Sequence, residues 1–282
     1  MFKKAKEMSL IVSWIAVDTH GVSSAYIASE SRISWSDRHP IDSFDSCRKT
    51  FFFKKYPEIV AYCGDVLFPS ILISSVIEAI DNGMIFKKED NAIKRFQRFK
   101  KYLFNEFHKY PKQRVTDSFE LIYINKDDVS MRYPTFYAYH IRWNRQNGFL
   151  STKISLPEKS ELLHVMGSGR IKFEQKYDQF KKRKCGGTSR NIYQCFSHLL
   201  LDENDQYFGG APQLVGLYRK PNTMGFAFGL VHNRKRYYNG LNIGNVISQE
   251  RINWRNKYFE ICEGKTKQRI PGSQIQERDL DI

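Results

Sequence analysis

The chain of 282 residues has little cysteine, and none of it follows a pattern typical of a disulfide-stapled or zinc-binding protein. The five cysteines are odd in number and widely spaced, and they form neither a Cys-x-x-Cys pair nor a Cys/His cluster at zinc-ligand spacing. These absences argue against a disulfide framework and a structural zinc ion. We therefore expect a reducing, cytoplasmic setting, with no bound metal and no cofactor.

Long apolar runs are also lacking. The most apolar stretch, residues 9–29, is interrupted by Asp18, Thr19, His20 and Gly21 before it reaches the ~18 apolar residues that a membrane span needs. Its Ile, Val and Trp content on both sides of that interruption favours two strands joined by a turn. We expect no membrane association.

The sequence lacks the common motifs of nucleotide and hydrolase sites. It contains no Gly-x-x-x-x-Gly-Lys-Ser/Thr, no Gly-x-Gly-x-x-Gly after a strand, no His-Glu-x-x-His and no Gly-x-Ser-x-Gly. ATP binding, dinucleotide binding and zinc peptidase chemistry are therefore disfavoured.

Positive charge is abundant, with 45 Lys and Arg against 30 Asp and Glu, a formal net charge of +15. Such a charge makes nucleic acid, acidic lipids and acidic partners candidates. However, most of it falls in residues 87–114 and 170–190, which read as helices, so we interpret it as a property of the helical exterior.

Strand and helix patterns occur in separate blocks: strands, two helices, strands, two helices, strands. Segregated blocks favour an α+β fold in which packed sheets are covered by helix layers, here a four-layer αββα sandwich. The polar residues 245–282 are expected to form a partly flexible C-terminal extension. We expect strands near 9–17, 22–28, 50–53, 59–63, 119–124, 135–143, 149–154, 213–218 and 225–231, and helices near 70–80, 90–110, 169–184 and 188–205.

Six short motifs follow one another along most of the chain. They are Met-Ser-Leu-Ile-Val-Ser at 8–13, Glu-Ser-Arg at 30–32, Arg-Lys at 48–49, Tyr-Cys-Gly-Asp at 62–65, Gly-Ser-Gly at 167–169 and Asp-Gln-Tyr-Phe-Gly-Gly at 205–210. Each is common alone. In this order and spacing they resemble the proteasome β-subunits and the related bacterial heat-shock peptidase, which are N-terminal-nucleophile (Ntn) hydrolases. The resemblance implies a domain at 9–244, preceded by an extension or propeptide at 1–8.

The resemblance also implies a catalytic site. Its residues would be Ser9 as nucleophile, where the family usually has threonine, with Lys49 and Glu30 beside it, and Ser168 and Asp205 hydrogen-bonded to the amine and nucleophile. The Gly64 N–H would face the oxyanion, and Ile33, Ser34 and Tyr62 would line the substrate cleft.

The chemistry explains why such residue types belong together. A serine hydroxyl needs a base, and the free α-amine of the same residue can serve, since its pKa of ~7.7–8.0 lies near neutral pH. Eight residues precede Ser9, so the amine must first be freed. We expect either cleavage between Met8 and Ser9 or translation starting at Met8, followed by removal of that methionine.

Two functions follow from these observations. The first is a proteasome-like peptidase or amidohydrolase that assembles as a homo-oligomeric ring, acts on peptides or proteins and could work with an ATPase unfoldase. The second is an inactive member of the fold that serves in binding or assembly, contacting nucleic acid through its basic helices and aromatic residues. In that case Glu30 and Lys49 form an ordinary ion pair, Ser168 caps a helix and Ser9 is a strand residue.

Overall fold

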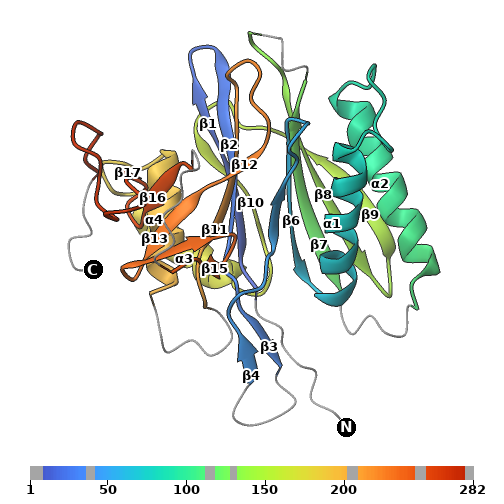
Figure 1. The fold of residues 1–282 in the computed structure, drawn as a ribbon, viewed down its shortest axis with the longest axis horizontal. Coiled ribbons are helices and arrows are strands. Elements are labelled where there is room, and N and C mark those ends of the chain that lie inside the picture. The colour runs from blue at the N-terminus through green and yellow to red at the C-terminus, as the bar shows by residue number, and fades with distance from the viewer. Residues whose placement is uncertain are drawn as a thin grey trace.

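The computed structural model of the protein describes residues 9–35, 42–111, 118–127, 132–201, 209–244 and 252–276 (Figure 1). Within these ranges the chain adopts the expected α+β class, with many strands and four helices. No helix in this part of the chain is long and apolar enough to cross a membrane. The expected extension at residues 1–8 lies outside the described ranges.

The N-terminal hairpin forms the centre of the first sheet. Its two strands are joined by a tight turn between Asp18 and Gly21, the polar interruption seen in the sequence. Most of their other residues are buried, which explains the nearly continuous apolar run. The strand order is β10-β1-β2-β11-β12, with bounds β1 (Ile11–Asp18), β2 (Gly21–Ser29), β10 (Glu161–Met166), β11 (Gln213–Tyr218) and β12 (Phe226–Ala227).

The second sheet is antiparallel throughout and follows the chain order. Its strands are β5 (Thr50–Phe52), β6 (Glu58–Gly64), β7 (Phe119–Lys126), β8 (Phe136–Asn144) and β9 (Gly148–Ile154). The first pair of helices is inserted between β6 and β7 in the sequence and packs on the outer face of this sheet (Figure 1).

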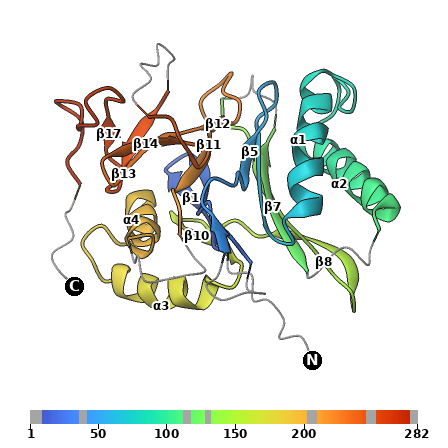
Figure 2. The same ribbon diagram turned by 60° about the horizontal axis from the view of Figure 1, so that its bottom comes forward.

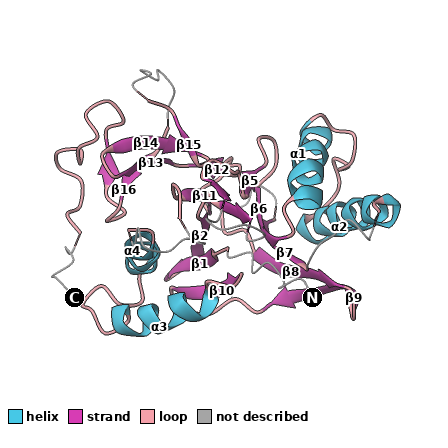
Figure 3. Ribbon diagram, turned by 90° about the horizontal axis from the view of Figure 1, so that it is seen from below, coloured by secondary structure: helices cyan, strands magenta, loops and turns pink. Residues whose placement is uncertain are grey.

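In the described part of the chain, four helices lie outside the two sheets. They are α1 (Leu67–Asp81), α2 (Ala92–Lys109), α3 (Arg170–Phe180) and α4 (Ser189–Leu199). The Asn91 side chain caps α2 by accepting a hydrogen bond from the Lys94 N–H, and Thr188 caps α4 in the same way from Asn191. Helices α3 and α4 lie on the opposite side of the molecule from α1 and α2 (Figures 2 and 3).

Three clusters of buried apolar residues form the cores between the helices and the sheets and between the two sheets. The first lies between α1, α2 and the second sheet, and the second lies between α3, α4 and the first sheet. The third, which includes Ile11, Ile27, Ile59 and Ile122, lies between the two sheets. Two sheets that pack face to face with helices on their outer faces are compatible with the expected proteasome-like sandwich.

The end of the chain contributes more regular structure than the sequence pattern predicts. A third sheet has the order β15-β14-β13-β16-β17, and β16 runs parallel to β13 across the expected boundary at residue 244. Trp254 and Cys262 are buried there although their neighbours are polar. The bounds are β13 (Gly229–His232), β14 (Lys235–Tyr238), β15 (Leu241–Asn242), β16 (Trp254–Asn256) and β17 (Ile261–Cys262), and a separate hairpin joins β3 (Ile33–Trp35) to β4 (Asp42–Phe44).

Candidate active site

Ser9 lies just before β1 and is held by the turn that precedes α3. Its backbone N–H donates to Ser168 Oγ at 3.2 Å, and its carbonyl oxygen accepts from the Gly169 N–H at 3.1 Å. Gly167 has a φ of +87°, and a Cβ there would lie 2.1 Å from the Ser9 carbonyl oxygen. The first glycine of the Gly-Ser-Gly motif is therefore needed locally, because only glycine permits both this backbone angle and this close approach.

Lys49 lies just before β5 and extends its side chain to Ser9. Its Nζ is 3.3 Å from Ser9 Oγ and also donates to the Arg32 carbonyl oxygen at 2.6 Å. A third hydrogen bond, which is also an ion pair, joins Nζ to Glu30 Oε1. Only 1% of the lysine side chain is exposed, so the ammonium group has exchanged water for these three oxygens.

Glu30 follows β2 and is completely buried. Its carboxylate also accepts hydrogen bonds from the backbone N–H groups of Leu10 and Arg32. Burial raises the pKa of Glu30 above its usual range, whereas the Lys49 ammonium and the two N–H groups act in the opposite direction. The Lys49 ammonium group thus contacts both the Glu30 carboxylate, which holds it in place, and Ser9 Oγ.

Sequence reasoning missed Gln213, the first residue of β11. Its Nε2 donates to the carbonyl oxygens of Glu30 and Cys47, and its Oε1 accepts from the Lys49 N–H at 3.0 Å. The side chain is fully buried. Gln213 therefore joins the backbone segments that carry Glu30 and Lys49, and a glutamine at the start of an otherwise apolar strand is the signal that could have drawn attention to it.

Ser31, inside the Glu-Ser-Arg motif, also has a structural role. Its hydroxyl donates to the Asp45 carbonyl oxygen at 2.6 Å and accepts from the Ala211 N–H at 2.7 Å. Arg32 forms a two-point ion pair with the Asp45 carboxylate. This motif therefore connects the end of β2 to the segment around Asp45, which precedes Lys49, and to the segment around Ala211, which precedes Gln213.

The structure brings together four of the expected catalytic residues: Ser9, Glu30, Lys49 and Ser168. Asp205 lies outside the described residues. Gly64 ends β6 with a φ of +89°, and a Cβ there would lie 2.2 Å from the Ser118 carbonyl oxygen. Packing alone therefore requires glycine at that position.

The three residues expected to line the substrate cleft lie in two different places in the structure. Ser34 and Ile33 lie in β3, where Ser34 is buried and Ile33 is partly exposed. The Tyr62 side chain is instead fully buried in the apolar cluster beneath α1 and α2, and its hydroxyl donates to the Arg48 carbonyl oxygen. Residues on β6 alternate between faces, and Tyr62 points toward the helices, where no substrate has access to it.

Three of the five aromatic residues of the basic helix α2 are unavailable for stacking, whereas Tyr102 and Phe104 are exposed. Phe96, Phe99 and Phe107 are buried against the second sheet. Since base stacking requires exposed rings, these residues give no support to the nucleic-acid interpretation. The basic residues of α2 and α3 lie on opposite sides of the molecule, as Figure 3 shows for the two helices.

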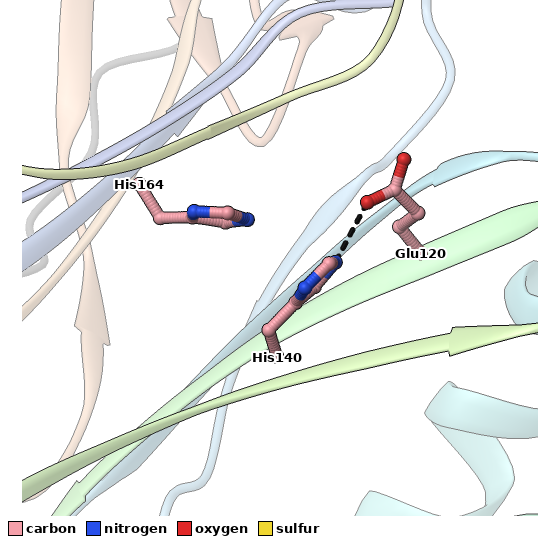
Figure 4. A group of neighbouring side chains, drawn as sticks. All are labelled: Glu120, His140 and His164. Carbon is pink, nitrogen blue, oxygen red and sulfur yellow. Dashed lines mark hydrogen bonds and ion pairs between the residues drawn. The ribbon is translucent and has the colours of Figure 1, made fainter. Parts of the chain in front are cut away.

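A second polar group lies away from Ser9, between the two sheets. Glu120 of β7, His140 of β8 and His164 of β10 point toward one another (Figure 4). His140 Nε2 and Glu120 Oε2 are 2.6 Å apart, and one donor atom of each of the three residues lies within 4.8 Å of the others. All three are partly buried, and among the described residues this is the group that could hold a metal ion.

Comparison with known proteins supports the fold alone. No protein-family model and no curated protein sequence matches the chain. Among solved structures, the chain is similar to Anbu (ancestral beta-subunit) from Yersinia bercovieri, with a TM-score of 0.50 and 11% sequence identity over 77% of this chain and 86% of that chain. At this identity the similarity shows a proteasome-like fold and carries no residue roles.

Proposed function

We propose that the protein is an Ntn hydrolase, a peptidase or amidohydrolase whose nucleophile is Ser9 after its α-amine has been freed. The observation that carries this proposal is the buried contact between Lys49 Nζ and Ser9 Oγ, with Glu30 on the far side of the ammonium group. The ammonium group thus lies where it can stabilise negative charge on the hydroxyl oxygen of Ser9, two residues before β1.

In the proposed reaction, the free α-amine of Ser9 takes the proton from Ser9 Oγ as that oxygen attacks the substrate carbonyl carbon. The amine then gives the proton to the leaving nitrogen as the amide bond breaks, which leaves an ester on Ser9. Water, deprotonated by the same amine, hydrolyses the ester and restores the hydroxyl. The α-amine suits both tasks because its ordinary pKa of ~7.7–8.0 is near neutral.

The neighbouring groups would support charge and orientation. The Lys49 ammonium favours the developing alkoxide, and Glu30 holds that ammonium in place. Ser168 Oγ is already hydrogen-bonded to the Ser9 nitrogen and would orient the amine. We assign the oxyanion contact to the Gly64 N–H, substrate contacts to Ile33 and Ser34, and a bridging hydrogen bond to Asp205.

The Ser9 nitrogen is an amide while Met8 remains attached, so activity requires exposure of the amine. We propose cleavage of the Met8–Ser9 bond, or a start at Met8 with removal of that residue because serine is small. We also propose that residues 9–244 form a four-layer αββα sandwich and that copies of the chain assemble into a homo-oligomeric ring. The ring would act on peptides or proteins in the cytoplasm, with an ATPase unfoldase as its partner.

The test compares the full chain with a chain whose first residue is Ser9, using hydrolysis of fluorogenic peptides and labelling by an Ntn-directed inhibitor. The Ser9-first chain should hydrolyse peptides and be labelled at Ser9, and Ser9→Ala and Lys49→Ala should abolish both. Ser23→Ala is the matched control, because the Ser23 hydroxyl donates to the Ala16 carbonyl oxygen on the neighbouring strand, within the first sheet.

Intact mass of the protein from its native host shows which residue is first in the cell. A mass that retains residues before Ser9, or a Ser9-first chain that is folded but neither hydrolyses nor is labelled, would overturn the proposal. The inactive, assembly-type member of the fold would then be the better interpretation.

A further inference from the structure

We propose that Glu120, His140 and His164 form a binding site for a divalent transition-metal ion, with Zn²⁺ as the ion that the ligand set favours. The three side chains supply two imidazole nitrogens and one carboxylate oxygen, all directed into one space (Figure 4). Two histidines and one carboxylate form a recurrent zinc ligand set, in which water occupies the fourth position of the tetrahedron. This site is separate from the proposed catalytic group and does not depend on it.

The ligands come from two different sheets. Glu120 and Ile122 are on the same face of β7, His140 pairs with Ile122 across to β8, and Ile122 belongs to the cluster between the sheets. His164 lies on β10, where it pairs with Ser13 of β1 in the other sheet. An ion held by all three would therefore join the two sheets.

Two cationic side chains lie near the three ligands. Arg142 and Arg170 are these cations, and their repulsion would weaken but not exclude binding.

Binding would draw the donor atoms closer together. Ligand atoms around a tetrahedral Zn²⁺ lie about 3.3 Å apart, given metal–ligand bonds of about 2.0–2.1 Å. The donor atoms here lie within 4.8 Å of one another, so they would contract around the ion by about 1.5 Å at most. The ion would replace the hydrogen bond between His140 and Glu120. The competing explanation is that the three residues bind no metal and that His140 and Glu120 only form this hydrogen bond.

The site would also steady the neighbouring active-site segment. His164 is close to the end of β10, and the chain passes from there into the Gly167–Ser168–Gly169 turn that holds Ser9. Fixing β10 against the second sheet would therefore restrict movement of that turn.

The experiment uses the purified full chain, freed of metal with a chelator and titrated with Zn²⁺ by calorimetry. We expect one ion per chain with a micromolar or tighter Kd, and visible d–d bands when Co²⁺ takes its place. At a hundredfold excess of free Zn²⁺ over Kd, the Tm should rise by about 5 °C or more. Mg²⁺ should bind far more weakly, because it prefers oxygen ligands.

Single variants identify the ligands. Glu120→Gln, His140→Ala and His164→Ala should each weaken Zn²⁺ binding by about 100-fold or more, beyond the 10–100-fold typical of a supporting group. His108→Ala, which removes an exposed histidine from α2, should leave the affinity unchanged. Melting of each variant in chelator verifies that it is folded.

Two results would overturn the proposal. One is the absence of saturable Zn²⁺ binding and of cobalt bands in the unsubstituted chain, in which case the group is a hydrogen-bonded pair beside a second imidazole. The other is Zn²⁺ binding that persists undiminished in His140→Ala and His164→Ala.

Discussion

The Lys49 ammonium nitrogen lies 3.3 Å from the Ser9 hydroxyl oxygen, and both residues are almost completely buried. The two residues come from different sheets, since Ser9 leads into β1 and Lys49 leads into β5. This contact therefore exists only because the two sheets pack together. It connects the stability of the sandwich with the chemistry that we propose for it.

The first prediction concerns the Lys49–Glu30 pair. Lys49→Met should lower the free energy of unfolding by about 3–5 kcal/mol, because it leaves the Glu30 carboxylate buried without its counter-charge. Adding Glu30→Gln should restore part of that loss. Urea denaturation followed by fluorescence measures both.

The exposed Lys109–Glu106 pair on α2 provides the control for this prediction. Lys109→Met should leave the unfolding midpoint close to that of the original chain, because exposed pairs contribute little. Equal effects at Lys49 and Lys109 would show that burial of the Lys49–Glu30 pair has no energetic consequence.

The second prediction concerns Gly167. Gly167→Ala should destabilise the protein by more than the strain of a positive φ alone, because the new Cβ would lie 2.1 Å from the Ser9 carbonyl oxygen. Gly21 has a similar φ of +95° but nothing within 4 Å of an added Cβ, so Gly21→Ala should cost only about 1–2 kcal/mol. Thermal melting of both variants decides, and a smaller effect at Gly167 than at Gly21 would refute the close approach.

The third prediction concerns Gln213. Gln213→Leu removes the side-chain partners of the Cys47 carbonyl oxygen and the Lys49 N–H, each of which then costs about 1–3 kcal/mol if it stays unpaired. The Glu30 carbonyl oxygen keeps its hydrogen bond from Ser29 Oγ. We expect a loss of several kcal/mol by urea denaturation. Gln175→Leu, on the exposed side of α3, should change little, and a similar result for Gln213 would contradict its linking role.

The fourth prediction concerns the pH dependence of stability at His232. Burial lowers the pKa of this histidine to about 4, whereas the unfolded chain takes up the proton near pH 6.5. Its contribution is therefore complete above pH 6.5 and is lost as the pH falls toward 4, by about 3 kcal/mol.

The measurement is the difference in unfolding free energy between the original chain and His232→Gln across that pH range. The difference should grow in favour of the original chain as the pH rises from 4 to 6.5. His108→Gln, at an exposed position, should show no such change. A flat difference for His232→Gln would mean that this imidazole is accessible to protons in the folded state.

Much of the local structure could be predicted from the sequence. The hairpin at β1 and β2 and the helix α2 are both visible in the apolar pattern of the sequence. The sheet that includes β16 was not visible, because the partner that β16 gives to the apolar strand β13 is a short strand in a polar segment of the sequence.

Some residues of the candidate site could likewise be predicted from the sequence, and others could not. The motif resemblance pointed to Ser9, Glu30, Lys49 and Ser168, and the structure brings their side chains or backbone together, while their catalytic roles stay a prediction. Gln213 stands out in the sequence as a polar residue at the start of an apolar strand, but its linking role could not be predicted, because its partners are backbone groups that carry no sequence signal. Tyr62 could not be assigned to a face, because a buried strand that is apolar on both sides does not reveal which side faces the helices.

By itself, then, the sequence determined the order of the helices and of most strands in the two packed sheets, together with the positive charge of the helical exterior, because these depend on neighbouring residues. Only the tertiary structure decided which distant residues meet: Ser9 with Lys49, and Glu120 and His140 with His164. Such meetings depend on how two sheets pack and in which register their strands pair. No local pattern encodes that, since every strand contributes to it at once.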